Sequence, residues 1–263
     1  MKTLKGKSVI ITGAGLGLGL AASVELASQG AHLTLVDYNE QALMEAHQHI
    51  SKKYADANII AISGDASKEE DVKHYVQETI KEFGRIDGLY NNAGIEGRQA
   101  PLAEYDVNIF KKVVDINLMG VYYGMRYVIP QMQKQKYGRI VNVSSVGGLR
   151  GVMNQTPYVA TKHAVIGLTK NAALEYARDG IITNAISPGA ILTPMVAEAF
   201  RQVNPADPKK AEAEYAQANP TKRLGLPEEV AKVVAFLLSE DISYVNGQVI
   251  AIDGGQSNSY GIV

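Results

Sequence analysis

Short runs of β-branched hydrophobic residues alternate along the chain with longer segments whose apolar positions recur at the helical period. Most of the short runs are nearly continuous in Val, Ile and Leu, which is typical of strands covered on both faces. The predicted strands are Ser8–Thr12, His32–Asp37, Asn58–Ser63, Ile86–Asn91, Arg139–Ser145, Thr183–Ser187 and Gln248–Asp253. The predicted helices are about 17–29, 39–54, 68–83, 107–134, 158–178 and 227–238. This alternation predicts an α/β fold with one doubly wound, seven-stranded parallel sheet and helices on both of its faces.

Several predicted helices have recognisable start and stop signals. Asn39 precedes the second helix as an N-cap, and Ser67 with Glu70 forms the pattern of a capping box for the third. Gly84 follows the third helix as a stop signal, and Pro227 opens the last one. No repeat or linker divides the chain, so we expect a single domain over residues 1–263.

The segment at about 190–226 departs from the alternation. Four prolines, Pro194, Pro205, Pro208 and Pro220, bracket alanine-rich helical pieces there. An insertion at the carboxyl edge of a parallel sheet is well placed to cover a substrate, so we predict a substrate lid. The alternative is a surface excursion without a function.

Composition narrows the class of protein. The 263 residues include 26 Lys+Arg and 27 Asp+Glu, for a formal net charge of −1, and no cysteine. The charge balance argues against nucleic-acid or anionic-membrane binding, and the lack of cysteine excludes disulfides, iron–sulfur clusters and a Cys nucleophile.

Lys2, Lys5 and Lys7 before an apolar stretch loosely imitate a secretory signal, but glycines and Glu25 interrupt that stretch. No stretch approaches the roughly 18 apolar residues of a membrane span, so we expect a cytoplasmic protein without a membrane partner.

A glycine-rich run, Thr12–Gly19, follows the first strand and opens the first helix. Glycines permit a tight turn and a close approach of backbone to a pyrophosphate, while the helix N-terminus supplies N–H groups. The predicted cofactor contacts in this loop are Gly13, Leu16, Gly17 and Gly19. A class I methyltransferase also places a glycine loop here, usually after an acidic residue, whereas this chain has Ile11 and Thr12.

Asp37 ends the second predicted strand, 18 residues beyond Gly19. A carboxylate at this position accepts hydrogen bonds from the adenosine ribose hydroxyls and repels a 2′-phosphate. No Arg or Lys stands beside it, where Tyr38 and Asn39 follow, so we predict NAD(H) as the cofactor. The alternative is that Asp37 is a solvated acid at a strand end.

Tyr158 and Lys162 are four residues apart on a predicted helix, so both side chains lie on one face. Such a pair arises easily by chance, so its assignment as a reactive pair depends on the residues around it. Ser144 and Ser145 end the fifth predicted strand just upstream, and a glycine-rich loop connects them to this helix. We expect Ser145 to be the reactive hydroxyl, although Ser144, on the opposite face of the strand, is the alternative.

These residues together resemble the short-chain dehydrogenase/reductase family, in its compact single-domain branch, over nearly the whole chain. The matching elements are the glycine loop, Asn91-Asn92-Ala93-Gly94, Asn117, Ser145 with Tyr158 and Lys162, Pro188-Gly189 with Thr193, the 223–230 segment, and Ile252-Asp253-Gly254-Gly255. Four stretches, at 91–99, 146–155, 189–196 and 252–257, resemble the members of the family that reduce cyclic diketones. The resemblance implies a Rossmann-type domain that transfers hydride between a nicotinamide and a ketone or secondary alcohol.

The resemblance also implies four catalytic residues. Tyr158 exchanges a proton with the substrate oxygen, and its pKa, ordinarily about 10, is expected to be lowered by Lys162 and by the positive nicotinamide ring. Lys162 also holds the nicotinamide ribose, and Ser145 orients the substrate oxygen. Asn117 is expected to connect Lys162 to solvent through water; the alternative is a polar residue that packs within its helix.

Further contacts are carried over in the same way. Asp65 is expected at the adenine, Asn92 behind the adenosine ribose, and Pro188-Gly189 with Thr193 at the carboxamide; Asp65 as a simple turn former is the alternative. The implied cofactor contacts beyond the glycine loop and Asp37 are Asp65, Ala66, Asn92, Gly94, Tyr158, Lys162, Pro188, Gly189, Ile191 and Thr193. The expected substrate contacts are Ser145, Tyr158, Glu96 and Gln155, with Val146 and Met195 as further wall candidates.

Several functional alternatives stay open at this point. The same chemistry on a steroid, sugar or acyl-thioester ketone is compatible with these motifs, as is a cofactor-binding sensor without turnover. Enoyl-thioester reduction is disfavoured, because family members of that type space Tyr and Lys more widely. His47 and His49 face different directions on one helix, so we predict no metal site. The family usually forms homotetramers through its two long central helices and C-terminal strand region, and we expect the same here, with residues 261–263 reaching a neighbour.

Overall fold

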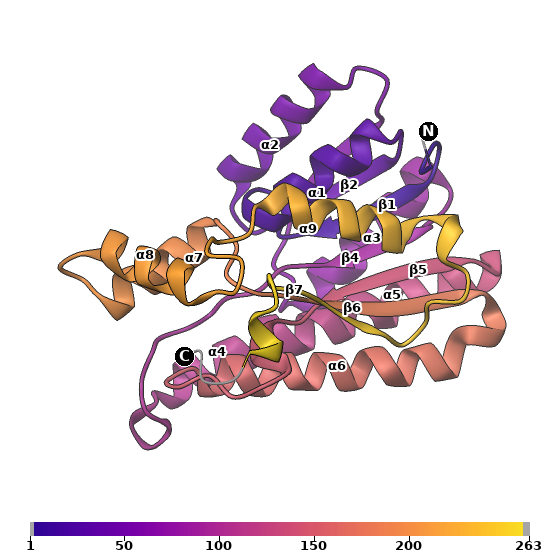
Figure 1. Ribbon diagram of the computed structural model, residues 1–263. Coiled ribbons are helices and arrows are strands. Elements are labelled where there is room, and N and C mark those ends of the chain that lie inside the picture. Colours follow the sequence, from indigo (N-terminus) through magenta and orange to yellow (C-terminus); the bar gives the residue numbers. More distant parts are fainter. Residues whose placement is uncertain (1–2, 260–263) are drawn as a thin grey trace.

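One seven-stranded sheet organises the computed structural model, which describes residues 3–259 (Figure 1). The strands are β1 (Ser8–Thr12), β2 (His32–Asp37), β3 (Ile59–Ser63), β4 (Gly88–Asn91), β5 (Gly138–Val143), β6 (Ile181–Pro188) and β7 (Val249–Ile252). Their order is β3-β2-β1-β4-β5-β6-β7, and every neighbouring pair is parallel. The predicted doubly wound parallel sheet is therefore confirmed, and β1 and β2 have the predicted bounds.

Helices cover both faces of this sheet (Figure 1). They are α1 (Gly17–Ser28), α2 (Glu40–Lys53), α3 (Glu69–Phe83), α4 (Val107–Val114), α5 (Gly120–Gln135), α6 (Thr156–Tyr176), α7 (Pro194–Val203), α8 (Pro208–Ala218) and α9 (Pro227–Leu238). Buried side chains of α1, α2 and α9 form one core with the strands, and those of α3, α5 and α6 form a second core. The hydrophobic burial that stabilises the sheet thus comes from both sides, as the continuous apolar strands predict.

The single helix predicted over 107–134 is wrong in one respect. Helix α4 ends at Val114, a π-helical turn spans Asp115–Met119, and α5 then continues. A π turn inserts one residue into the helical repeat, and such turns occur frequently at functional sites. Here the turn places Asn117 in the interior, with its side chain fully buried. The apolar period does not reveal this turn, because the residues on either side of it still read as one amphipathic helix.

Three predicted helix boundaries are confirmed, one of them the start of α9 at Pro227, and one is wrong. The Asn39 side chain accepts a hydrogen bond from the third residue beyond it, and Gly84 ends α3 with φ of 71°. The capping box at Ser67 and Glu70 is absent, since the Ser67 hydroxyl donates instead to Asp65 at 2.7 Å. Asp65 offers an acceptor two residues away, which competes with the helix N-terminus for the serine.

Helices α7 and α8 stand apart from the layered body at the carboxyl edge of the sheet (Figure 1). They correspond to the helical pieces predicted within 190–226. They share a small core of their own, centred on Phe200, Ala211 and Leu224. Between residues 3 and 259, no helix is long and apolar enough to cross a membrane. We expected residues 261–263 to reach a neighbouring copy, but they lie outside the described residues. Lys2, part of the stretch that imitates a secretory signal, lies outside them too.

Candidate active site

A cleft of about 490 Å³ opens where the carboxyl ends of β1, β2, β4, β5 and β6 meet. Ligands of doubly wound sheets bind at this edge, where the strand order reverses. The predicted cofactor residues that line it are Gly13, Leu16, Gly17, Asp37, Asp65, Ala66, Asn92, Gly94, Tyr158, Lys162, Pro188, Gly189, Ile191 and Thr193. Ser145 and Met195 line the same cleft.

Gly19 is the predicted loop residue that does not line this cleft. A Cβ atom at position 19 would lie 1.9 Å from the carbonyl oxygen of Gly13 and 2.8 Å from Nδ2 of Asn92. Gly19 therefore lets α1 approach the turn after β1, and its contribution is close packing. Gly13 must also lack a side chain, because a Cβ at position 13 would lie 2.9 Å from Nδ2 of Asn92.

Asn92 and Thr12 bind β1 and β4 together at the floor of the cleft. The Asn92 amide donates to the carbonyl oxygens of Thr12 at 2.9 Å and Gly13 at 3.1 Å. The Thr12 hydroxyl accepts from the backbone N–H groups of Asn92 and Ala93 at 3.0 and 3.1 Å. The glycine loop is consequently held in place by the chain itself, with a backbone surface suited to a dinucleotide.

Asp37 ends β2 at the rim of the cleft, half-buried. Its Oδ2 accepts from the N–H of Gly15 at 2.9 Å, and its Oδ1 accepts from the N–H of Asn39 at 2.9 Å. These bonds hold the carboxylate beside the glycine loop, where it can accept further bonds from two adjacent hydroxyls. The negative charge of the Asp37 carboxylate would repel a phosphate at the same place.

Strand β5 ends at Val143, so Ser144 and Ser145 lie just beyond the strand predicted to contain them. The Ser144 hydroxyl is buried and donates to the carbonyl oxygen of Lys162 at 2.9 Å. The Ser145 hydroxyl accepts from the N–H of Gly147 at 3.1 Å, and it lies near enough to Tyr158 to lower the pKa of the phenol. Of the two serines, Ser145 is thus the one whose hydroxyl acts on the phenol.

The environment of Tyr158 raises the pKa of its phenol to about 12. Burial is the main cause, the hydrogen bond with Ser145 opposes it, and the charge of Glu96 adds to it. The chain by itself therefore shifts this pKa opposite to the expected direction and keeps the phenol protonated. The Nζ of Lys162 lies 5.5 Å from the ring centroid, beside the face of the phenol and without a hydrogen bond to its oxygen.

Lys162 is 4% exposed, and its Nζ donates to the carbonyl oxygen of Val143 at 2.8 Å. Burial lowers the pKa of Lys162 to about 8, so the ammonium form still predominates at neutral pH. Gly94 borders this amine, because a Cβ at position 94 would lie 3.6 Å from Nζ and 3.2 Å from Oδ1 of Asn117.

Asn117 does not line the cleft and lies directly behind it. Its Oδ1 accepts from the N–H of Ile95 and its Nδ2 donates to the carbonyl oxygen of Ile95, both at 2.8 Å. Nδ2 also reaches the hydroxyl of Thr161 at 3.4 Å. The π-helical turn therefore fixes the loop after β4 against α6, one residue from Lys162.

Glu96 and Gln155 contact each other although 59 residues separate them. The Gln155 amide donates to Oε1 of Glu96 at 2.6 Å, and the Gln99 amide donates to the same oxygen at 3.1 Å. Burial raises the pKa of Glu96, and the charge of Glu198 on α7 raises it further. Neither Glu96 nor Gln155 belongs to the cleft lining, and the predicted wall residue Val146 is buried outside that lining as well.

Some cleft residues were missed by the sequence reasoning. Ile95, Lys112 and Ile116 line the cleft from the loop after β4 and from α4 with its π turn. Lys112 and Ile116 are four apart, so they share a helix face, but many residue pairs on this helix have that spacing. Only the packing of α4 against α6, beside the cleft, identifies this pair.

The geometry agrees with the similarity of this chain to known proteins. Residues 13–257 match the family model described as enoyl-(acyl carrier protein) reductase. The chain is 50% identical over 252 residues to levodione reductase of Leifsonia aquatica, covering 96% of this chain and 94% of that protein. It is 40% identical over 259 residues to cyclohexanol dehydrogenase of Acinetobacter sp. (strain SE19), covering 96% and 95%.

Solved structures show the same likeness. A crystal structure of levodione reductase matches with a TM-score of 0.96 and 49% identity, covering 98% of this chain and all of that one. A crystal structure of NAD⁺-bound xylitol dehydrogenase matches with a TM-score of 0.92 and 36% identity, covering 96% and 99%.

The lowered pKa of Lys162 predicts a pH dependence of folding stability. Between pH 8 and about 10 the unfolded chain binds the lysine proton that the folded chain has lost, so stability should rise with pH over this window. Relative to Lys162→Met, the wild type should gain about 1–3 kcal/mol of unfolding free energy between pH 7 and 10. Urea denaturation across this range measures the difference. Lys170→Met, at an exposed position of the same helix, should keep a constant difference from wild type, and a constant difference for Lys162→Met would contradict the prediction.

Proposed function

This chain belongs to the short-chain dehydrogenase/reductase family, and we propose that it is an NAD(H)-dependent enzyme that interconverts a small cyclic ketone and its secondary alcohol. The observation that carries the proposal is the convergence of Ser145, Tyr158 and Lys162 at one end of the cleft that the glycine loop opens. The names of the levodione and cyclohexanol relatives support a cyclic substrate. The description of the family model names enoyl reduction, but the four-residue spacing of Tyr158 and Lys162 favours carbonyl chemistry.

In this proposal four residues of the chain carry the proton chemistry. Tyr158 donates a proton to the substrate oxygen during reduction, and its raised pKa keeps that proton available. Ser145, beside the phenol, donates to the same oxygen and orients it. Lys162 places a positive charge beside the ring and offers N–H groups to the nicotinamide ribose. Asn117 positions the loop that borders Lys162 and connects this amine to solvent through water.

The cofactor fits the chain at several points. The dinucleotide, when bound, supplies or accepts the hydride. Gly13, Leu16 and Gly17 offer backbone to the pyrophosphate at the N-terminus of α1, since the absence of side chains at the glycines leaves this surface open. The adenosine half is assigned to Asp37, Asp65, Ala66, Asn92 and Gly94, and the nicotinamide half to Pro188, Gly189, Ile191 and Thr193. Asp65 also accepts from Ser67, so its role as a turn former and its place in the cleft coexist.

The Glu96–Gln155 pair supports a substrate with a polar group in addition to the reacting oxygen. The charge of Glu96 acts on the pKa of Tyr158, so the carboxylate lies near the reacting position. Its Oε1 already accepts two amide hydrogen bonds, whereas its Oε2 accepts none within residues 3–259. We assign Glu96 and Gln155 to the polar end of the substrate site, with Met195 of α7 as an apolar wall.

Tyr158→Phe should retain NADH binding and lose at least about 100-fold in kcat on a cyclic ketone, because the proton donor is gone while the ring still packs. Ketone-dependent loss of NADH absorbance and NADH fluorescence titration measure the two quantities. Tyr176→Phe, at the far end of α6, is the matched control and should behave like wild type. Substantial turnover by Tyr158→Phe would remove the phenol from its role, and cofactor binding without turnover by the wild type on a broad ketone and diol panel would favour a sensor.

Asp37→Ala should narrow the preference for NADH over NADPH by at least about 10-fold, since a charge that repels the 2′-phosphate is removed. The measurement is kcat/KM for both cofactors, with Asp56→Ala, in the loop after α2, as the control. A wild type that prefers NADPH would refute the cofactor assignment.

We further propose a cytoplasmic homotetramer. Large apolar side chains are exposed on α5, α6 and α9 and in the loop before β7: Tyr122 at 37%, Leu174 at 82%, Phe236 at 52% and Tyr244 at 100%. Strand β7 has a partner on one side only, so its other edge can also meet a second copy. Light scattering should give a mass near four times the 28.3 kDa chain, and a monomeric mass would contradict the proposal.

A further inference from the structure

The segment 253–258 lies between the lid helices and the turn that ends β6. The N–H of Gly189 donates to the carbonyl oxygen of Ile252 at 3.0 Å. A Cβ at position 189 would lie 2.9 Å from Oε1 of Gln256 and 2.9 Å from Cβ of Asp253. The segment therefore packs directly on a glycine of the cleft lining, and no larger residue would leave room for it.

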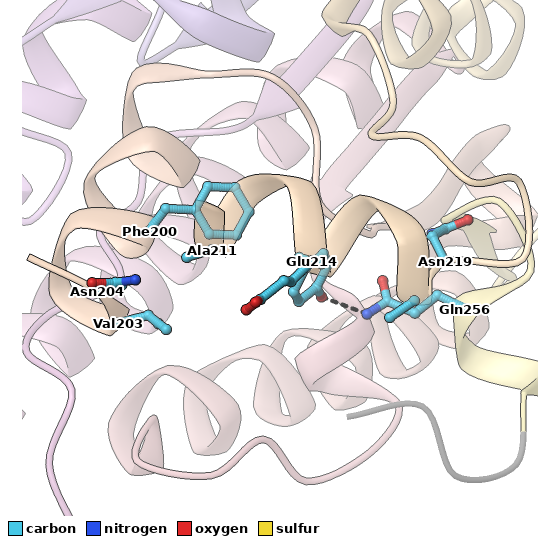
Figure 2. A pocket seen from close by; sticks show the side chains of 9 residues that line it. Phe200, Val203, Asn204, Ala211, Glu214, Asn219 and Gln256 are labelled. Carbon is cyan, nitrogen blue, oxygen red and sulfur yellow. Dashed lines mark hydrogen bonds between the residues drawn. The ribbon is translucent and has the colours of Figure 1, made fainter. Parts of the chain in front are cut away.

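Gln256 connects this segment to helix α8. Its side chain is 2% exposed, and its amide nitrogen donates to the hydroxyl of Tyr215, the bond drawn as a dashed line in Figure 2. Its Oε1 has no hydrogen-bond partner within residues 3–259. The ring of Tyr215 meets Phe200 of α7 edge-on, with centroids 5.7 Å apart. A continuous line of contacts thus runs from Gly189 through Gln256 and Tyr215 to Phe200.

A cavity of about 390 Å³ separates the lid helices beside this line of contacts, with Phe200 and Val203 on the α7 side and Gln256 opposite (Figure 2). Space that side chains do not fill contributes no dispersion contacts, so the packing that holds α8 is weak here. Asn219, just after α8, donates to the carbonyl oxygen of Asp253 at 2.9 Å and fixes the end of the helix. The Tyr215–Gln256 bond is one turn earlier and restrains the body of the helix.

We propose that Gln256 is a positioning residue that holds α7 and α8 closed over the substrate end of the cleft. Helix α7 begins with Pro194, Met195 and Val196 in the cleft lining and carries Phe200 one turn later, so displacement of Phe200 shifts the wall. Gly189 keeps its bond to Ile252 whatever occupies position 256. Loss of the Gln256 amide therefore weakens substrate binding and spares cofactor binding. This inference rests on the proposed function for the identity of the substrate.

Gln256→Met removes the amide with little change in size, and Tyr215→Phe removes only the hydroxyl and keeps the ring against Phe200. Each should raise the KM for cyclohexanone about 5–20-fold, with kcat and the Kd of NADH within about 2-fold of wild type. The double variant should be no worse than the poorer single variant, because both remove the same bond. Gln217→Met, at an exposed position of α8, is the matched control and should leave KM unchanged.

Limited proteolysis tests the same contact without turnover. The connection between α7 and α8, residues 204–207, should be cleaved about 5-fold faster in Gln256→Met and Tyr215→Phe than in wild type or Gln217→Met. If the wild type reduces no ketone, the proposed function fails while proteolysis still tests the contact. Unchanged cleavage in both variants overturns the inference. A KM that stays at the wild-type value in both variants also overturns the inference, as does a Kd of NADH that rises together with KM.

Discussion

The relative position of Ser145, Tyr158 and Lys162 depends on a reciprocal contact between α6 and the end of β5. The buried Lys162 amine donates to the carbonyl oxygen of Val143 at 2.8 Å, and the Ser144 hydroxyl donates to the carbonyl oxygen of Lys162 at 2.9 Å. Two hydrogen bonds in opposite directions therefore join neighbouring residues of the strand end to one residue of the helix. Gly148 makes this approach possible, since a Cβ there would lie 2.1 Å from the Ser144 hydroxyl and 2.8 Å from the Lys162 carbonyl oxygen. Tyr158, one helical turn before Lys162, is thereby held against Ser145.

Burial acts on the two titratable groups of this contact in opposite directions. It lowers the pKa of Lys162 to about 8 and raises the pKa of Tyr158 to about 12, because burial disfavours the charged form of each. At neutral pH the amine is still mainly charged and the phenol is protonated. That pair of states suits proton donation to a developing alkoxide. Burial is the largest effect on the phenol in the chain alone, which is why the expected lowering of the Tyr158 pKa is not found.

The sequence allowed prediction of those features that depend on local pattern or on short motifs. The apolar runs predicted the bounds of β1 and β2. Most of the glycine loop, Asp37, Asn92, and four residues between Pro188 and Thr193 come together in one cleft. Features set by tertiary packing escaped prediction. The π turn at Asp115–Met119 depends on the bonds of Asn117 to Ile95, and Ser67 bonds to Asp65 rather than to the helix it precedes. The sign of the Tyr158 pKa shift follows from burial, which spacing along the chain does not encode.

The proposed catalytic residues and helices α7 and α8 differ in how firmly the chain holds them. Ser144, Lys162 and Asn117 are each almost fully buried, and their side chains donate to backbone carbonyl oxygens of α6, of the end of β5 and of the loop after β4, respectively. Helices α7 and α8 instead share a core of three buried residues and border a cavity. Lower packing density makes an element easier to displace and more tolerant of substitution. If the proposed function holds, we expect selectivity for a particular ketone to change through α7 and α8, while the groups proposed for the proton chemistry stay fixed to the sheet and α6.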